Sequence, residues 1–342
     1  MTRKIGLLQV KYAAAAVLKA CGLLSLFEKI SVRNKAFVLM YHRVLDLDEC
    51  QDISVQPGMF VSKKSFDRQL AYLMNKYEII FVEELAKRII NGDNIDQTCA
   101  ITFDDGWLDN YTIAFPILKK YKVPATIFLT SGFVGTDKIF WPEELCFYLD
   151  VIEEDFTGYK GLLPSVARFF GEIRTFRRQN RVMYFDKCID VLKGFQAQDR
   201  SDVLAYLREN NILLPMPRQM MKWEEVKEMY ASGYVRFGAH TVSHELLDQV
   251  STQIAEDEIR TSKNDIEKQV GCSVSSFAYP NGNYRESTLD ILENAGFVCA
   301  VTTRKGFTDL ATNQYKIPRI PLHEDVSKTV SMFAARLLFR AF

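Results

Sequence analysis

Short apolar runs with strand character alternate with segments of helical periodicity along most of this 342-residue chain. Residues 36–41 form one such run, and Phe66, Leu70, Leu73 and Tyr77 then recur at the spacing of a single helix face. Further strands are predicted at residues 78–82, 99–103, 124–130, 234–239, 275–279, 297–302 and 315–322. Alternation of this kind is typical of a parallel sheet with crossover helices on its outside. We therefore expect an α/β fold, a distorted (β/α) barrel of about eight strands.

The alternation stops between about residues 139 and 222. This stretch is rich in Phe, Arg, Leu and Tyr at helical spacing and contains no clear strand. Because a segment of this length in a compact domain carries its own structure or a function, we interpret it as a helical insertion, a lid or a substrate-binding surface. The predicted organisation is an N-terminal helical segment (1–32), a barrel domain (33–325) that contains the insertion, and a C-terminal amphipathic helix (326–342).

Composition excludes some classes of partner and cofactor. The chain carries 43 basic and 43 acidic residues, so the basic excess of a nucleic-acid-binding protein is absent. Its seven cysteines are scattered without a C-x-x-C pair, which argues against a disulfide framework or a thiolate zinc site. Reduced thiols in the cytoplasm are the simpler interpretation. No sequence feature indicates an oligomeric state.

Both ends of the chain combine apolar and basic residues. Lys11 and Lys19 interrupt the N-terminal apolar segment, so it lacks the roughly 20 apolar residues that span a bilayer, and it shows no clear signal-peptide cleavage site. A helix packed on the domain is the simpler prediction, and a helix lying on a membrane surface is the alternative. Residues 332–342 have the same character, so peripheral contact with the inner membrane face is a further expectation.

Polar residues follow several predicted strands, at the end where active sites of (β/α) barrels lie. These residues are His42, Asp104, Asp105, His240, His244, Asn281 and His323. The chain has only four histidines, and two of them are four residues apart. If a helical turn begins at His240, both imidazoles project from one face. Together with one carboxylate they would form a three-ligand site with open positions, as in catalytic zinc sites. The alternative is that one histidine caps a turn and the other is exposed.

Asp104 and Asp105 cannot point in the same direction from one backbone. We expect one of them to bind the metal and the other to face the substrate as a base, because a metal-bound carboxylate is a poor base. A simple Asp-Asp-Gly turn is the alternative. It explains Gly106 but not the apolar strand that precedes the pair.

The segments Thr102-Phe-Asp-Asp-Gly106 and His240-Thr-Val-Ser-His244 resemble the first two motifs of polysaccharide deacetylases, the NodB-like carbohydrate esterase family 4. Residues 39–44 are similar to the first strand of many such proteins, and residues 277–282 to the third motif. The resemblance spans roughly residues 36–322, apart from the insertion. It implies a distorted barrel of the NodB-homology type, with Asp104 as general base. Asp105, His240 and His244 would bind a divalent metal, most often zinc.

The reaction implied by the resemblance is hydrolysis of an N-acetyl group on a hexosamine of a polysaccharide, oligosaccharide or lipid-linked sugar. A backbone N–H near Asn281 would stabilise the oxyanion. The third-motif arginine of the family is replaced by Ala278, and Arg319 could take its place or be an ordinary surface residue. For the acid that protonates the leaving amine we favour His42, with His323 as the alternative.

Two other functions fit the same residues. One is hydrolysis of a different C–N bond, as in a deformylase or a cyclic amidase, and the other is a catalytically silent glycan-binding protein. Trp107 and Tyr284 could stack on a sugar ring or belong to the core.

Overall fold

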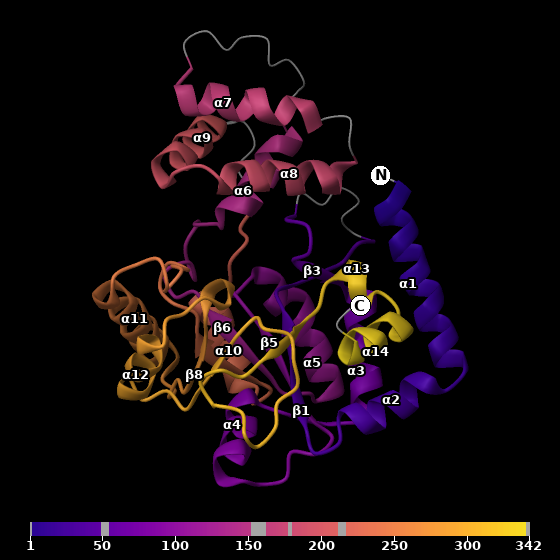
Figure 1. The fold of residues 1–342 in the computed structure, drawn as a ribbon. Helices are drawn as coiled ribbons and strands as arrows, with labels where there is room; N and C mark the ends of the chain where they lie inside the picture. Colours follow the sequence, from indigo (N-terminus) through magenta and orange to yellow (C-terminus); the bar gives the residue numbers. More distant parts are fainter. Residues whose placement is uncertain (1, 49–54, 152–161, 177–179, 211–216, 340–342) are drawn as a thin grey trace. The chain divides into compact units, whose positions relative to one another are not determined.

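The apolar runs form a parallel sheet of eight strands in the computed structural model, which describes residues 2–48, 55–151, 162–176, 180–210 and 217–339. The strands follow the order β10-β1-β5-β6-β7-β8-β9, and β4 also pairs with β5. Figure 1 labels β1, β5, β6 and β8 of this sheet. Their bounds are β1 Ala36–Tyr41, β4 Glu78–Ile80, β5 Thr98–Phe103, β6 Ala125–Leu129, β7 Val235–Ala239, β8 Ser276–Ala278, β9 Cys299–Val301 and β10 Arg319–Pro321. A second, two-stranded sheet pairs β2 Arg43–Leu45 with β3 Phe60–Ser62.

The eight-stranded sheet nearly closes on itself. The N–H of Thr302, just after β9, donates to the carbonyl of Ile317 at 2.8 Å, and the N–H of Ile317 donates to the carbonyl of Ala300 at 3.1 Å. These bonds join β9 to the segment that leads into β10, which itself pairs with β1. The predicted distorted (β/α) barrel is confirmed.

The strands around the closure are shorter than the sequence predicts. Instead of strands at 297–302 and 315–322, the structure has three-residue strands. An isolated bridge between Val301 and Ile317 joins the two segments. Pro318 accounts for the short β10, since a proline has no N–H to donate to the neighbouring strand.

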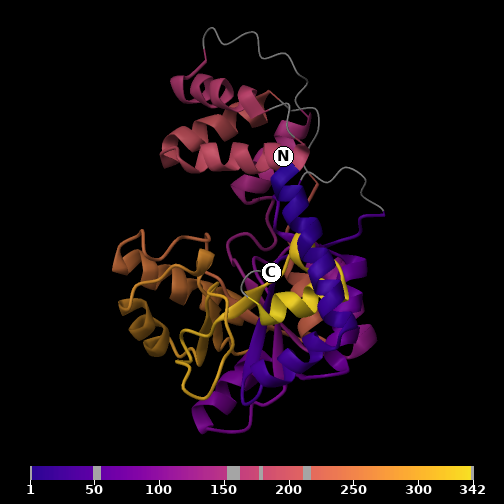
Figure 2. The same cartoon turned by 45° about the vertical axis from the view of Figure 1, so that its right-hand side comes forward.

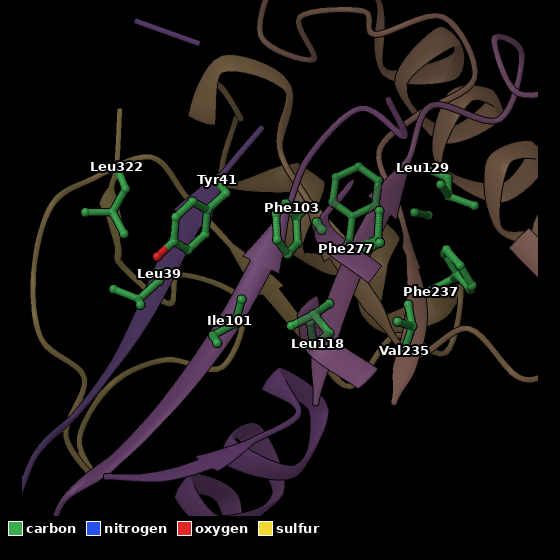
Figure 3. Close-up of a cluster of buried hydrophobic side chains, with 14 of the residues drawn as sticks. Leu39, Tyr41, Ile101, Phe103, Leu118, Leu129, Val235, Phe237, Phe277 and Leu322 are labelled. Atoms are coloured by element: carbon green, nitrogen blue, oxygen red, sulfur yellow. The ribbon is translucent and has the colours of Figure 1, made fainter. Parts of the chain in front are cut away.

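Alternate residues of the central strands face two apolar clusters. Every residue of β1 and β5 is buried, as expected for parallel strands that are covered on both faces. Leu39, Tyr41, Ile101 and Phe103 point to the outer cluster, where Leu118 of α5 packs against them (Figure 3). The intervening residues pack with α4 in the inner cluster. Asp104 directly follows β5 and His240 directly follows β7, so polar residues lie at the carboxyl ends of these strands.

The chain divides into two compact units. One unit comprises Met1–Glu49, Phe60–Asp137 and Gln219–Phe342, and the other comprises Cys50–Met59 and Lys138–Arg218. The first contains the sheets and α1 Thr2–Ala20, α2 Leu23–Ser31, α3 Lys63–Met74, α4 Val82–Asn91, η1 Asn110–Ala114, α5 Phe115–Tyr121, α10 Trp223–Ala231, α11 Thr252–Val270, η3 Pro280–Gly282, α12 Ser287–Asn294, α13 Glu324–Ser327 and α14 Val330–Leu338. The second contains α6 Trp141–Val151, α7 Pro164–Ile173, η2 Arg174–Phe176, α8 Arg181–Lys193 and α9 Ala197–Glu209.

The second unit has an apolar core of its own. Side chains from α6 to α9 form a separate buried cluster that includes Leu145, Phe169, Phe170, Phe185 and Leu207. Its described residues contain helices and no strand. All of these helices lie within residues 139–222, the segment that the sequence predicts as a helical insertion. The second unit therefore has a hydrophobic core that stabilises its own fold.

The C-terminal end differs from the single amphipathic helix predicted at 326–342. Thr329 divides it into α13 and α14, because its side-chain oxygen accepts a hydrogen bond from the N–H of Met332 and caps α14. Residues 340–342 lie outside the described residues. Met332, Phe333 and Leu337 are buried, so the apolar side of α14 packs inward.

The N-terminal segment forms two helices, α1 and α2, which lie beside α14 (Figures 1 and 2). Ala15 of α1 packs with Leu24 of α2 and with Ala335 of α14. Among the described residues, no single helix is long and apolar enough to cross a membrane. Only Gln9–Ala20 and Leu23–Ser31 taken together have that length and hydropathy, and they are bent by 86°.

Candidate active site

Asp105, His240 and His244 come together at the carboxyl ends of β5 and β7. The Nε2 atoms of His240 and His244 lie 3.5 Å and 3.6 Å from Oδ1 of Asp105. One ligand atom from each residue lies within 4.8 Å of the other two. The four-residue spacing was compatible with a helical turn, but the histidine pair does not lie on one. Instead Thr241 and His244 both adopt φ near +63°, and this left-handed backbone folds the loop so that the two rings approach.

The surroundings of these three side chains are suited to binding a metal. His240 Nδ1 lies 2.7 Å from the carbonyl of Ala278, so Nδ1–H donates there and the lone pair of Nε2 faces Asp105. Among the described residues, Oδ1 of Asp105 is buried without a hydrogen-bond partner. Buried carboxylate oxygens normally have one, so this atom is suited to bind a cation. Burial and the neighbouring His240 lower the pKa of His244 to about 4, which leaves its imidazole neutral and able to bind a metal near pH 7.

Trp107 supports this cluster, although no definite role was predicted for it from the sequence. Its indole Nε1–H donates to Oδ2 of Asp105 at 2.9 Å, which leaves Oδ1 for the histidines. The Trp107 side chain is 1% exposed, so it is a core residue and presents no ring to a sugar. The guanidinium of Arg43 lies 4.5 Å from the ring centroid, and Nε of Arg43 donates to buried Asp109 at 2.8 Å. The only sequence feature that pointed to a role for Trp107 was its position directly after Asp-Asp-Gly.

Asp104 is held by Arg319. Nη1 and Nη2 of Arg319 donate to the two carboxylate oxygens at 2.6 Å and 2.7 Å. Arg319 is fully buried, so it is not the ordinary surface residue that the sequence left as an alternative. Its Nη1 also donates to Oγ1 of Thr102 at 3.1 Å, and its Nε donates to the carbonyl of Thr302 at 3.0 Å. Burial favours the neutral acid, but the Arg319 charge outweighs it and lowers the pKa of Asp104, so the carboxylate is ionised.

The two candidate acids lie in different surroundings. Nε2 of His42 is 4.0 Å from Oδ2 of Asp104, and Nδ2 of Asn110 donates to the His42 carbonyl at 2.7 Å. His323 precedes α13, and its Nδ1 lies 3.9 Å from Oδ2 of Asp325. Burial lowers the pKa of His323. The structure thus brings His42, the residue favoured from the sequence, beside the carboxylate of Asp104.

Asn281 lies in the short turn η3, where it adopts φ +54°. Its side-chain amide donates to Asn283 at 2.8 Å, and its carbonyl accepts from the Thr303 hydroxyl at 3.1 Å. Nearby, the Tyr284 ring stacks on buried Tyr279 with centroids 4.5 Å apart, so one face of Tyr284 is already covered. The predicted role of the Asn281 backbone N–H in stabilising an oxyanion stays a prediction.

Residues 91–154 and 181–300 match the family model described as polysaccharide deacetylase. The chain belongs to the polysaccharide deacetylase family. The matched residues include both aspartates and both histidines of the candidate metal site, and the resemblance noted in the sequence is confirmed.

Relatives and solved structures agree with this assignment. YxkH of Bacillus subtilis is 23% identical over 292 residues, which cover 85% of this chain and 72% of YxkH. Poly-beta-1,6-N-acetyl-D-glucosamine N-deacetylase of Staphylococcus aureus is 22% identical over 310 residues, covering 85% and 80%. Among solved structures, IcaB from Ammonifex degensii aligns with a TM-score of 0.56 at 20% identity, covering 89% of this chain and 99% of IcaB. The deacetylase PplD of Streptococcus pyogenes aligns with a TM-score of 0.54 at 22% identity, covering 86% and 94%.

Proposed function

We propose that this polysaccharide deacetylase is a zinc-dependent enzyme that removes N-acetyl groups from an N-acetylglucosamine polymer or oligomer. The observation that carries the proposal is the pairing of two carboxylates with different partners. Asp105 faces two imidazoles with a buried, unpartnered oxygen, whereas its neighbour Asp104 is ionised and locked by Arg319. This division gives one carboxylate to a metal and keeps the other available as a base.

The donor set supports zinc as the metal. Two imidazole nitrogens and one carboxylate oxygen are a three-ligand combination found in catalytic zinc sites, with the remaining positions open to water and substrate. Zinc bound there would polarise the acetyl carbonyl and lower the pKa of a water molecule. Other divalent ions accept the same ligands, so metal identity is part of the proposal that the experiment must test.

The surrounding residues would supply the proton transfers. Asp104 takes a proton from the attacking water, and the bidentate contact with Arg319 fixes the direction of its carboxylate. The water oxygen bonds to the acetyl carbon, the carbon–nitrogen bond then breaks, and His42 protonates the departing nitrogen. The products are acetate and a free amine. The backbone N–H at Asn281 would help to stabilise the tetrahedral oxyanion.

The name of the Staphylococcus aureus relative suggests the first substrate to test, a β-1,6-linked N-acetylglucosamine oligomer. Acetate release is measured for this oligomer and for its β-1,4-linked counterpart, with chelator-treated protein before and after zinc is added. Asp104→Asn preserves the shape of the side chain and removes the base. Zinc-dependent acetate that disappears in this variant supports the proposal. Release of formate or ring opening of a cyclic amide would instead favour another C–N hydrolase, and glycan binding without acetate would favour a silent binding protein.

A further inference from the structure

Helix α2 turns its apolar side toward solvent. Four of its large apolar residues recur at i, i+3, i+4 and i+7, the spacing of one helix face, and all four are exposed: Leu23 (40%), Leu26 (53%), Phe27 (39%) and Ile30 (65%). The opposite side is buried through Leu24 and Glu28. An amphipathic helix on a globular protein normally buries its apolar stripe, so the polarity of α2 is inverted.

Helix α1 also exposes apolar side chains, although Tyr12 and Ala15 make its packed side apolar too. Val10 and Val17 are 63% and 60% exposed, and Ala13 and Ala14 lie on the same exposed face. Six of the thirteen exposed large apolar side chains in the described part of the chain fall between residues 10 and 30. Apolar side chains scattered singly over a surface need no explanation, but a concentrated stripe marks an interaction site.

Polar contacts hold α2 in this orientation. The buried Glu28 carboxylate accepts hydrogen bonds from the Tyr72 hydroxyl at 2.8 Å and from the Tyr77 hydroxyl, and it pairs with the ammonium of Lys76. If α2 rotated to bury Leu26, Glu28 would lose these partners. A buried carboxylate without partners is costly, so the outward apolar face is a property of the folded protein.

The charge of the N-terminal segment indicates which kind of partner this exposed face fits. The first 35 residues contain seven basic residues and one acidic residue, the buried Glu28, whereas the other 307 contain 36 basic and 42 acidic residues (43 less 7 and 43 less 1). The segment therefore has a net charge of +6 on a chain that is otherwise −6. An exposed apolar stripe flanked by basic side chains complements a bilayer that carries anionic headgroups.

A cavity of about 780 Å³ is lined by three basic residues, one acidic residue and mainly apolar side chains. The charged residues are Lys35, Arg304, Lys305 and Asp309. The ammonium of Lys305 donates to the carbonyl of Phe339 at 2.6 Å, and the Phe339 ring contacts that of Phe27 at 5.7 Å between centroids. With Asp309 counted, these residues add a net positive charge near the edge of the exposed stripe.

We propose that α1 and α2 form a surface that docks on an anionic phospholipid bilayer, with their exposed apolar side chains in the headgroup region and the basic residues on lipid phosphates. Two joined helices at 86° define a plane, so both can lie on one membrane surface without crossing it. Docking would hold the enzyme at the membrane. It does not depend on the substrate or on the metal.

Co-sedimentation of the full chain with vesicles tests the proposal. Vesicles of phosphatidylcholine alone are compared with vesicles that also contain about 30% phosphatidylglycerol, at low and high salt. Leu26→Gln/Ile30→Gln removes part of the apolar stripe, and Lys29→Glu/Arg33→Glu reverses two charges beside it. The matched controls alter residues on other helices that are equally exposed: Ile90→Gln/Ile254→Gln (52% and 48%) and Lys87→Glu/Lys268→Glu.

The wild type should bind the anionic vesicles in preference to neutral ones, and less at high salt. Each α2 variant should lower the partition coefficient by about tenfold or more, while both control variants bind like the wild type. Thermal unfolding of the variants should match the wild type, because all the altered side chains are exposed. Wild-type protein that remains in the supernatant with both vesicles would overturn the proposal. The proposal would also be overturned if the wild type self-associates and Leu26→Gln/Ile30→Gln abolishes this self-association. That result would show that the exposed face of α2 binds a second copy of the chain.

Discussion

The contact between Arg319 and Asp104 predicts a large coupling energy between two residues that are 215 positions apart. Arg319 and Asp104 have side chains that are 0% and 3% exposed, and their two hydrogen bonds measure 2.6 Å and 2.7 Å. Arg319→Met keeps much of the side-chain length and removes the charge, so the Asp104 carboxylate stays buried without its partner. Removing one member of a buried pair costs about 3–5 kcal/mol of unfolding free energy.

The double variant Arg319→Met/Asp104→Asn separates this effect from the loss of other contacts. It removes both charges, so its loss of stability should be smaller than the sum of the two single losses by about 3 kcal/mol. The bonds from Arg319 to Thr102 and Thr302 are lost in both Arg319 variants, so they cancel in the comparison. The pair Arg260–Glu256 is the control, because its side chains are 41% and 35% exposed and its coupling should be about 0.5 kcal/mol or less.

Urea unfolding followed by tryptophan fluorescence measures these energies. Two of the three tryptophans, Trp107 and Trp223, belong to the barrel unit, and Trp141 belongs to the other. A Trp141→Phe background therefore makes the signal specific for the barrel, and a chelator removes any contribution of bound metal. Single losses that add within about 0.5 kcal/mol would refute the reasoning, because the pair would then behave like a surface contact.

Three further predictions follow from the same site. Trp107→Phe removes the hydrogen bond to Asp105 and should weaken zinc binding by about 10-fold or more in calorimetric titration, whereas unchanged affinity would show that Asp105 needs no such support. His42→Ala should lower kcat by about 10²-fold or more with bound zinc unchanged, whereas His323→Ala should not, and the reverse pattern would make His323 the acid. Burial lowers the pKa of His323, so the contribution of the neutral imidazole to stability is complete above about pH 6.5 and declines as the pH falls. In thermal unfolding, His323→Gln should make this decline smaller. A pH dependence that is the same in the variant and the wild type would contradict the prediction.

The sequence predicted most of the barrel because its strands and helices carry local signals. Ser251 caps α11, and Gly271 ends it in the left-handed conformation, which are the positions that these residue types favour. Every residue of the apolar runs 36–41 and 99–103 is buried in the structure. Local patterns could not give the lengths of the strands near Pro318, which depend on pairing partners far along the chain.

The predictions were less complete where the site depends on contacts between distant segments. Arg319 is positioned because β10 pairs with β1 and β1 with β5, and no spacing in the sequence reveals that order. The Ala278 carbonyl orients His240 through a backbone atom, a role that the identity of the side chain cannot indicate. The approach of His240 and His244 through left-handed residues was missed because the four-residue spacing also fits a helix.

The exposed side of α1 and α2 shows a different limit. Their sequences have the periodicity of helices, but periodicity does not say which side faces the protein. For α2, the orientation is set by hydrogen bonds and an ion pair between Glu28 and residues on or just after α3, Tyr72 and Lys76. These residues lie outside the N-terminal segment. The sequence therefore left both a packed helix and a membrane-bound helix open.

The most direct test of the account is a zinc titration of the chelator-treated protein with bound metal and acetate release measured on the same samples. The oligomer is saturating, and the wild type is compared with His244→Ala, which removes one ligand, and Asp104→Asn, which leaves all three. The account predicts that wild-type activity rises in proportion to bound zinc and saturates when the Asp105, His240 and His244 site is filled. Asp104→Asn should bind zinc without releasing acetate, and His244→Ala should lose both. Acetate release that is independent of bound zinc, or unaffected by Asp104→Asn, would contradict it.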